Sequence, residues 1–325
     1  MARVESNIVF SPSASQYAES YSGANGGYIV SETGIMAALA PHLKGLHLLG
    51  HRPKLLEVAA GTGQATQRII NVLDYAGINN YDLLSTEYSR SMINAGKKVN
   101  ESSDISVAKI PDLQAAAEYL PVQDGYFDAV FASQGIHWFK DIQGSLSEAY
   151  RVLMSGGMAV HAASGILEGY GDKHFTEHPS YKEYLKNVKV ELMQKGFWRK
   201  ESEEFEPKNR KNVNPFFHRY SVEDVKGMFE IAGFEDVQVI HYFHPVNKAE
   251  MLLRMSAGAA SMFIFGGEYA KEISSEQRIE IVQNAITKLQ REKSELLDDL
   301  DKNPTGEPVP VFIGKKPRVL VQQAA

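Results

Sequence analysis

An acidic residue and two glycines stand together in the segment LLEVAAGTGQATQRII, residues 55–70. Gly61 and Gly63 lack a Cβ atom, so the backbone can approach a ligand closely, and the start of the helix that follows offers unpaired N–H groups. Glu57 lies in the apolar run just before this turn. The pattern indicates a ligand-binding turn, although two glycines can also serve tight packing of a strand on a helix.

A second acid, Glu87, ends the later stretch YDLLSTEYS. In an open α/β sheet, an acid about 20 residues after the glycine turn accepts hydrogen bonds from ribose hydroxyls. Glu87 taken with the two glycines therefore predicts a nucleoside ligand. The alternative is a solvated acid at a strand end.

The kind of nucleoside follows from departures from the dinucleotide fingerprint GxGxxG. Thr66 stands in the place of the third glycine, and Glu57 puts a carboxylate where it would repel a pyrophosphate. A ligand with an ammonium group, such as the methionine half of S-adenosylmethionine, suits an acid at this place. The alternative is that Glu57 is a buried acid with internal hydrogen bonds.

Strands that alternate with helices must position these residues. The pattern predicts strands at 55–58, 81–89, 105–112, 126–134, 156–164 and 235–243, and one or two more within 307–323. It predicts helices at 31–43, 65–77, 89–100, 145–153, 221–234, 248–264 and 275–301. Such alternation predicts a parallel sheet covered on both faces.

Polar and small residues mark several of these helix ends. Ser31, with Glu32 or Thr33, is expected to cap the first helix, and Ser221 and Gly233 bracket a later one. The apolar stripe of the 275–301 helix indicates either packing on its own domain or a coiled-coil interface that would form a homodimer.

We expect one elaborated domain with insertions. Its expected parts are an N-terminal helical lid (1–50), a cofactor-binding core (51–164), a cap insertion (165–219), a continuation of the core (220–247), a helical insertion (248–305) and the terminal strand or strands of the core (306–325).

The composition is that of an ordinary globular protein, with 43% apolar and 23% charged residues in 325. A net charge of −6 gives no broad attraction to nucleic acid or anionic lipid. The sequence has no cysteine, which excludes disulfides and thiolate chemistry. It also lacks the pattern of a secretory signal or of a bilayer span. We expect a soluble, cytoplasmic protein that acts on a small molecule.

Four segments resemble, in order and spacing, the class I S-adenosylmethionine-dependent methyltransferases. They are LLEVAAGTGQAT, STEYSRSMI, LPVQDGYFDAVFASQGIHWF and EAYRVLMSGG, within residues 55–164. The HWF segment is similar to that of small-molecule enzymes such as the trans-aconitate methyltransferase-like group. The resemblance implies a Rossmann-like α/β fold with a mostly parallel seven-stranded sheet, helices on both faces and helical cap insertions. It also implies S-adenosylmethionine as the cofactor.

Carried over by position, the resemblance implies a set of residues that border the cofactor. They are Glu57, Ala59, Gly61, Gly63 and Gln134 at the methionine part, Glu87 at the ribose, Tyr88, Ala116 and Ala117 at the adenine, and Tyr21 and Tyr28 in the N-terminal lid.

Four of these positions depart from the family pattern or carry an alternative. Ala59 replaces the usual first glycine of the turn, and Ala116 stands where many members have an Asp that reaches the adenine amino group. Either Glu118 or a backbone contact would have to replace that Asp. Tyr21 and Tyr28 could equally serve packing within the lid.

His137 is the candidate catalytic base or acceptor-orienting group, because it follows the strand whose carboxyl end faces the ligand. Alternatively, the HWF segment is a structural turn with Trp138 and Phe139 packed beneath it. His174 and His178 lack a third defined ligand, so no metal site is predicted.

The expected reaction is transfer of a methyl group from S-adenosylmethionine to a small organic acceptor, with oxygen as the expected receiving atom, in a pocket formed by the insertions. Such a transfer requires mainly alignment of donor and acceptor. A base is needed only for a weakly acidic acceptor. One alternative is a cofactor-binding scaffold or partner subunit that does not methylate. Another is a nicotinamide-dependent oxidoreductase, against which Thr66 and Glu57 argue.

Overall fold

The computed structural model describes residues 26–101, 109–163, 175–198, 220–257, 265 and 272–318. The chain divides into two compact units. The sheet unit contains residues 28–166, 220–242 and 309–325, and the helical unit contains residues 1–27, 167–219 and 243–308.

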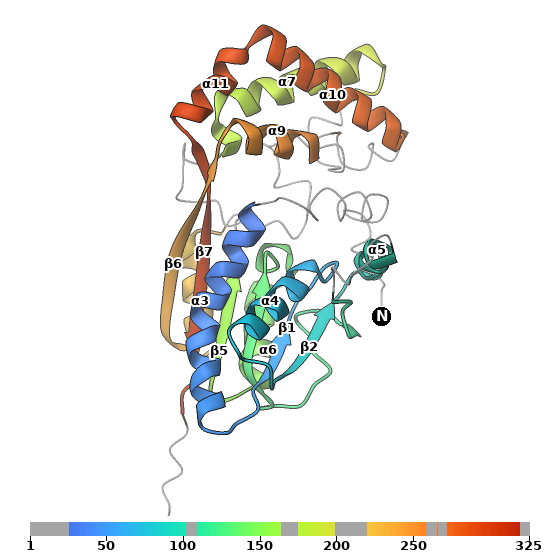
Figure 1. The fold of residues 1–325 in the computed structure, drawn as a ribbon. Helices are drawn as coiled ribbons and strands as arrows, with labels where there is room; N and C mark the ends of the chain where they lie inside the picture. The colour runs from blue at the N-terminus through green and yellow to red at the C-terminus, as the bar shows by residue number, and fades with distance from the viewer. Residues whose placement is uncertain are drawn as a thin grey trace, which may run out of the picture. The chain divides into compact units, whose positions relative to one another are not determined.

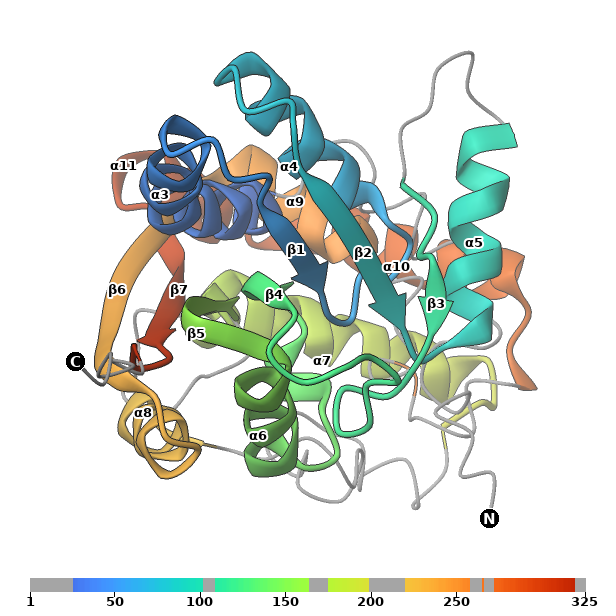
Figure 2. The same ribbon diagram turned by 90° about the horizontal axis from the view of Figure 1, so that it is seen from below.

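The sheet has seven strands in the order β3-β2-β1-β4-β5-β7-β6 (Figures 1 and 2). They are β1 (Lys54–Glu57), β2 (Asp82–Glu87), β3 (Leu113–Gln114), β4 (Phe127–Ser133), β5 (Leu153–Ala162), β6 (Glu235–Val246) and β7 (Thr305–Lys315). The pairs β1–β2, β1–β4, β2–β3 and β4–β5 are parallel, and β7 runs antiparallel to β5. The predicted mostly parallel seven-stranded sheet is confirmed.

Helices cover both faces of the sheet. They are α3 (Gly26–Leu48), α4 (Gln64–Tyr75), α5 (Arg90–Glu101), α6 (Ile142–Val152) and α8 (Val222–Ile231), with a short 3-10 helix, η1 (Ile136–Trp138). Alternate residues of a strand point to opposite faces. Leu55 of β1 therefore packs in a core with α3 and α4, whereas its neighbour Leu56 packs in a second core with α6 and α8. Figure 2 shows α3 and α4 on one face of the sheet and α6 and α8 on the other.

Capping residues fix several helix ends. The Ser221 hydroxyl accepts a hydrogen bond from the Asp224 backbone N–H at 3.1 Å, and the Asp224 carboxylate accepts one from the Ser221 N–H at 2.9 Å. This reciprocal capping box confirms Ser221 as the start signal of α8. Asp141 caps α6 in a related way by accepting a hydrogen bond from the Gly144 N–H at 2.9 Å.

The predicted cap at Ser31 is wrong, because α3 begins at Gly26 and Ser31 lies inside the helix. The Ser31 side chain is fully buried and its hydroxyl accepts a hydrogen bond from the Gln134 side-chain amide. A serine that finds a tertiary partner in this way does not need to cap a helix.

The predicted third strand is displaced. Residues 102–108 lie outside the described residues, and β3 begins only at Leu113, where Leu113 pairs with Thr86. Pro111 lacks an N–H and cannot donate to the ladder, so regular pairing starts after it.

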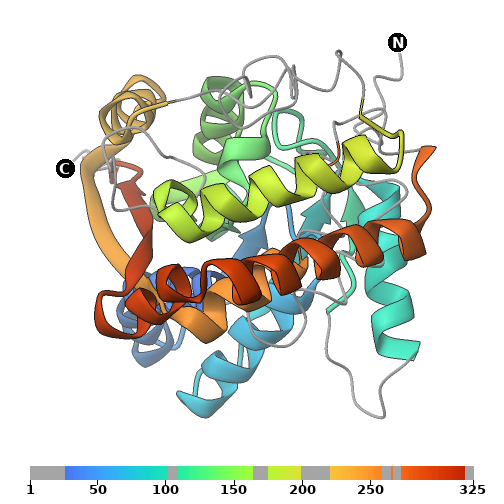
Figure 3. The same ribbon diagram turned by 90° about the horizontal axis from the view of Figure 1, so that it is seen from above.

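The helical unit contains α7 (Pro179–Gln194), α9 (Lys248–Ala257), α10 (Ser275–Glu292), α11 (Ser294–Lys302) and a short 3-10 helix, η3 (Phe175–Glu177). Helices α7 and α10 run side by side (Figure 3). The predicted 275–301 helix is two helices, because the backbone of Lys293 leaves the helical region at φ −144° and ψ 38°.

The apolar stripe of α10 is used inside this unit. Ile281, Val282 and Leu289 are buried in one cluster with residues of α7 and α9, and Leu297 of α11 joins them. This is the expected packing of the stripe on its own domain. A homodimer stays a prediction. Among the helices that the structure describes, none is long and apolar enough to cross a bilayer.

Candidate functional site

The two glycines of the turn after β1 have different roles. Both have positive φ, +62° at Gly61 and +81° at Gly63. A Cβ at Gly63 would lie 1.8 Å from the Lys109 carbonyl oxygen, so this glycine is required for packing. A Cβ at Gly61 would meet only the Met92 Cε, at an ordinary 3.5 Å. The Gly61 side of the turn is therefore where a ligand has room to approach the backbone.

Glu87 lies at the carboxyl end of β2, directly beside this turn. Its Oε2 accepts a hydrogen bond from the Gly61 N–H at 2.9 Å, and its Oε1 accepts one from the Ser89 N–H at 2.7 Å. Burial raises the pKa of the Glu87 carboxyl, and these backbone donors lower it. The Tyr88 backbone also contributes a hydrogen bond that lowers this pKa. A carboxylate has about four lone-pair sites, so capacity remains for a ribose hydroxyl. The geometry fits the expected ribose contact.

Glu57 is the most buried acid of the site. Its Oε2 is sealed from solvent and lacks a well-formed hydrogen bond from any described residue. Burial, reinforced by the nearby Glu32 and Glu87 carboxyls, raises the pKa of Glu57 to about 8 despite the opposing effects of Thr66 and Lys109. A buried acid with so little compensation fits a cationic ligand, whose charge would favour the ionised form.

Glu32 brings a third carboxyl from α3. The Arg68 guanidinium on α4 binds it in a two-pronged fashion, with Nε and Nη2 each 2.7 Å from one carboxylate oxygen. Burial nevertheless raises the pKa of Glu32. Because Arg68 is engaged by Glu32, its charge is only partly available to balance Glu57.

The turns that follow β1 and β4 press against each other. Ala59 and Gln134 both have positive φ, +58° and +57°, which is strained for residues with a side chain. A Cβ at Gly135 would lie 2.9 Å from the Ala59 Cβ. The Gln134 side-chain amide donates to Ser31, which ties the turn after β4 to α3. Strain held by surrounding contacts in this way is typical of ligand-binding turns.

His137 lies in η1, immediately after the turn that begins at Gln134. Its side chain is 8% exposed, and its ring stands beside the Trp138 ring with centroids 5.3 Å apart. Ile136 and Phe139 are buried in the core. The buried Ile136 and Phe139 agree with a structural turn. The position of His137 just after β4 agrees with a role toward a bound acceptor. The segment therefore combines features of both alternatives.

The turn after β3 also begins beside Glu87. The Ala115 N–H donates to the Glu87 carbonyl oxygen at 3.1 Å, and Ala116 bridges to Tyr119. Ala117 is 8% exposed, and the Glu118 Oε1 accepts a hydrogen bond from the Asp141 N–H. The Glu118 carboxylate is therefore directed at the start of α6, which weakens it as a replacement for the missing Asp.

The remaining predicted residues divide into described and undescribed ones. Tyr88 is 45% exposed, and its carbonyl oxygen accepts a hydrogen bond from the Gln114 amide at 3.0 Å. Tyr28 belongs to α3, but its side chain is outside the described residues, as is the whole of Tyr21.

The two histidines considered as metal ligands, His174 and His178, also divide in this way. His174 lies outside the described residues, and His178 caps α7 by accepting from the Ser180 N–H. In the described part of the chain, His, Asp and Glu do not gather in threes that could hold a metal ion.

The sequence analysis missed the contributions of Ser31, Glu32 and Arg68 to this site. Glu32 and Arg68 are 36 positions apart, and no local spacing connects them. Arg151 and Glu148, which contact the turn after β3, were also missed, although their i, i+3 spacing on a predicted helix was a visible signal.

The two turns, Glu57, Glu87 and His137 lie at or just beyond the carboxyl ends of β1, β2 and β4, and the turn that begins at Ala115 follows the carboxyl end of β3. The sheet order reverses between β1 and β4, since the chain leaves β1 toward β2 and β3 and returns to place β4 on the other side. In open α/β sheets, ligands bind outside the carboxyl ends of the strands at such a switch point. We call residues 57–63, 87–89, 114–120 and 134–139 the carboxyl edge.

Comparison with known proteins places this edge in context. Residues 56–161 match the family model described as a methyltransferase domain. A ubiquinone/menaquinone biosynthesis C-methyltransferase of Wigglesworthia glossinidia brevipalpis is 32% identical over 104 residues, which is 32% of this chain and 40% of that protein. The chain thus spans about two fifths of the length of the first relatives it matches.

Two further relatives extend over more of the chain. A ubiquinone/menaquinone biosynthesis C-methyltransferase of Rickettsia prowazekii is 30% identical over 194 residues, 58% of this chain and 69% of that one. A malonyl-[acyl-carrier protein] O-methyltransferase of Geobacter sulfurreducens is 27% identical over 216 residues, 64% of this chain and 67% of that one. A solved structure of a putative methyltransferase from Bacillus halodurans aligns at 16% identity and a TM-score of 0.42, covering 85% of this chain and 98% of that one.

Proposed function

The chain belongs to the class I S-adenosylmethionine-dependent methyltransferases, and from this premise we propose that it transfers a methyl group to a small organic acceptor, with oxygen as the receiving atom. S-adenosylmethionine is the cofactor of this family. The finer resemblance to the trans-aconitate methyltransferase-like group stays a prediction.

The observation that carries the proposal is the pairing of Gly61 with Glu87. The bare backbone at Gly61 has room for a ligand, and the same residue's N–H fixes the Glu87 carboxylate beside it. In our proposal the Glu87 carboxylate accepts hydrogen bonds from the ribose hydroxyls, and the backbone around Gly61 lies against the adjoining part of the cofactor. Glu57 supplies negative charge toward the cofactor's cationic groups.

When bound, the cofactor supplies a methyl group on a positively charged sulfur, so the protein does not need to generate a reactive charge. The chain's contribution is alignment and exclusion of water, and positioning alone can lower a barrier by roughly 7 to 11 kcal/mol. Ala59 and Gln134 hold the turns after β1 and β4 in strained but fixed conformations, which suits this task.

His137 is the proposed acceptor-side group. For an alcohol or phenol acceptor, its imidazole would take the proton that the oxygen loses. For a carboxylate acceptor no proton has to leave, and His137 would only orient the acceptor.

The relatives support two acceptor chemistries. The relative from Geobacter is named as an O-methyltransferase, in agreement with oxygen as the receiving atom. The relative from Rickettsia is named as a C-methyltransferase of quinone biosynthesis, which makes an activated aromatic carbon the competing acceptor. His137→Ala separates a carboxylate acceptor, which should keep its rate, from a phenol or an aromatic carbon, which should lose most of it because each must give up a proton. The position of the new methyl group in the product then separates oxygen from carbon.

The test is release of S-adenosylhomocysteine during incubation with panels of carboxylic acids, phenols and quinol analogues. Turnover with one panel and its loss in the Glu87→Ala variant are expected. Tight cofactor binding with no demethylated product across all panels would contradict the proposal and favour a cofactor-binding scaffold.

A further inference from the structure

We propose that Arg151 is a positioning residue that holds the turn of residues 115–120 rigid, so that the backbone of this turn selects adenine in the cofactor. The inference rests on the proposed cofactor binding, which it deepens. It concerns the part of the carboxyl edge where an acidic side chain was expected and is absent.

The turn starts directly next to the proposed ribose acid. The Ala115 N–H donates to the Glu87 carbonyl oxygen at 3.1 Å, and the Tyr119 N–H donates to the Ala116 carbonyl oxygen at 3.1 Å. A nucleoside whose ribose is held by Glu87 would therefore present its base to this tight turn.

The side chains of the turn offer little that could read a base. Ala116 and Ala117 end in methyl groups, which form no hydrogen bonds. The Glu118 carboxylate accepts a hydrogen bond from the Asp141 N–H at 3.0 Å, at the start of α6. Tyr119 carries the other polar side chain of the turn, and this residue is 82% exposed. We assign discrimination by hydrogen bonding to backbone N–H and C=O groups, which discriminate only if they are held in place.

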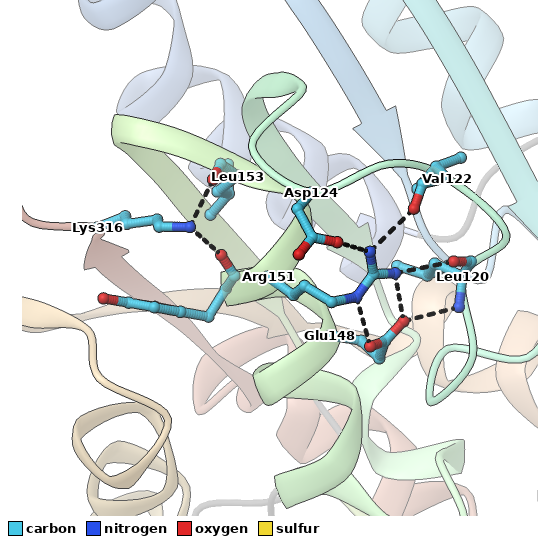
Figure 4. Close-up of polar contacts among 8 residues, drawn as sticks. Leu120, Val122, Asp124, Glu148, Arg151, Leu153 and Lys316 are labelled. Atoms are coloured by element: carbon cyan, nitrogen blue, oxygen red, sulfur yellow. Dashed lines mark hydrogen bonds and ion pairs between the residues drawn. The ribbon is translucent and has the colours of Figure 1, made fainter.

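Arg151 on α6 provides this restraint. A guanidinium has five N–H donors, and each of them has an acceptor here (Figure 4). Nη2 donates to the Leu120 carbonyl oxygen and Nη1 to the Val122 carbonyl oxygen, both at 2.9 Å. Nη1 also donates to Asp124 at 2.5 Å, and Nε and Nη2 donate to Glu148 at 2.8 Å.

Glu148 completes the clamp from the same helix. Its Oε2 accepts the Leu120 N–H at 2.9 Å as well as an Arg151 N–H. Leu120 is thus held through both its N–H and its C=O, and its side chain is buried in the core beside α6. The hydrogen bonds from Arg151 lower the pKa of Glu148, so the pair stays ionised at neutral pH.

A second cation, Lys316, follows β7 and contacts the end of α6 at other carbonyl groups. The Lys316 ammonium donates to the carbonyl oxygens of Tyr150 and Leu153, both at 2.7 Å, and so ties the end of α6 to β7 (Figure 4). Lys316 is therefore a matched control for Arg151, since both bind backbone carbonyls around α6 and only Arg151 reaches the 115–120 turn.

The chemistry of the base gives a readout that general destabilisation would not move. Adenine has an amino donor at position 6 and an acceptor at N1, whereas hypoxanthine has a carbonyl acceptor at position 6 and a donor at N1. A rigid backbone fits one pattern and leaves polar groups unpaired with the other. A loosened turn can adapt to either, so selectivity falls even where affinity is partly kept.

The experiment measures dissociation constants for S-adenosylhomocysteine and S-inosylhomocysteine by calorimetry. The native protein is expected to prefer the adenosyl compound by about 100-fold, and Arg151→Met to reduce this preference to about threefold. Arg151→Lys should lie between them, because an ammonium cannot span both carbonyls and Glu148. Lys316→Met should keep the native preference even if its unfolding temperature falls.

The inference is overturned if Arg151→Met keeps the native preference, or if the native protein binds both compounds equally. A native protein that binds neither compound would instead overturn the proposed function. Should Arg151→Met fail to fold, Glu148→Gln carries the same comparison, because it preserves size while weakening the grip on Leu120.

Discussion

At the carboxyl ends of β1 and β2, three buried carboxyl groups, Glu32, Glu57 and Glu87, have Arg68 as their one ion-pair partner among the described residues, and it binds Glu32. Beside the segment that joins β3 to β4, by contrast, Arg151 of α6 has an acceptor for every N–H. A region whose charges are balanced has its partners already and acts as scaffold. A region with an excess of buried carboxyl groups gains stability from a cationic ligand, whose charge favours their ionised form.

The largest expected effect is on the ribose acid. Glu87→Ala should weaken binding of S-adenosylmethionine by roughly 100-fold, because two hydrogen bonds to a charged group contribute about 1.5 kcal/mol or more each. Calorimetry measures this change, with Glu87→Gln as the control that keeps the side-chain size. Unchanged affinity in the alanine variant would remove the ribose role from Glu87.

The second prediction concerns the unbalanced charge itself. With a pKa of about 8, Glu57 holds a proton at neutral pH in the free protein. Bound positive charge favours the ionised form, so affinity for S-adenosylmethionine should rise from pH 6 to about pH 8 and then level off. Glu57→Gln should lose about tenfold in affinity at pH 8 and show no such rise. Affinity for S-adenosylhomocysteine, whose sulfur is uncharged, should change less with pH.

The same titration affects the free protein's stability. The folded-state pKa of Glu57 lies above its ordinary value of 4.5, so the folded state binds more protons than the unfolded state between pH 4.5 and about 8. The stability contributed by the protonated acid is lost as pH rises through that window. Denaturant titrations should show this slope, and Glu57→Gln should abolish it; an identical slope in the variant would place the titration on another group.

Some features of both regions follow from local sequence and others do not. The glycine turn, the helix start at Ser221 and the alternation of strands and helices depend on neighbours in the chain, and these predictions are confirmed. The pairing of Glu32 with Arg68 joins two helices far apart in sequence, and it arises only when α3 packs beside α4.

Errors in the prediction have the same origin. Serine is a common cap, so local sequence favours a helix start at Ser31, whereas tertiary contact with Gln134 fixes that serine inside α3. The break at Lys293 between α10 and α11 has no Gly or Pro to signal it. The delayed start of β3 follows from Pro111, which cannot donate to the ladder.

A buried polar group without a hydrogen-bond partner does not by itself indicate a ligand, and His161 provides a third prediction that tests this. His161 on β5 is fully buried against the Phe229 ring, and neither of its ring nitrogens has a hydrogen-bond partner among the described residues. It lies in the core beside α8, so we expect it to lower the free energy of unfolding without taking part in cofactor binding. His161→Phe should raise the free energy of unfolding by about 1 kcal/mol at pH 7 and leave cofactor affinity unchanged.

Titration of His161 should make folding stability depend on pH, without an effect on cofactor binding. Burial lowers its pKa from 6.5 to about 4, so the unfolded state binds more protons between these values. The native protein should lose stability as pH falls from 6.5 toward 4, and His161→Phe should lose less. A loss of cofactor affinity in this variant would contradict the distinction between the carboxyl edge and the core.

The smallest expected effect is at the contact between α3 and the turn after β4. Ser31→Ala removes the hydroxyl that accepts from the Gln134 amide, a hydrogen bond that contributes about 1 kcal/mol net. Affinity for S-adenosylmethionine should fall severalfold, because the strained Gln134 backbone loses a support. Ser147→Ala is the matched control on the exposed side of α6, and it should change nothing.

Saturable binding of radiolabelled S-adenosylmethionine to the native protein, measured by equilibrium dialysis at pH 8, tests the central claim most directly. The account predicts one equivalent bound, displaced by S-adenosylhomocysteine and not by reduced nicotinamide dinucleotide, and strongly reduced binding in the Glu87→Ala variant. Absence of saturable binding, or displacement by the nicotinamide compound, would contradict it.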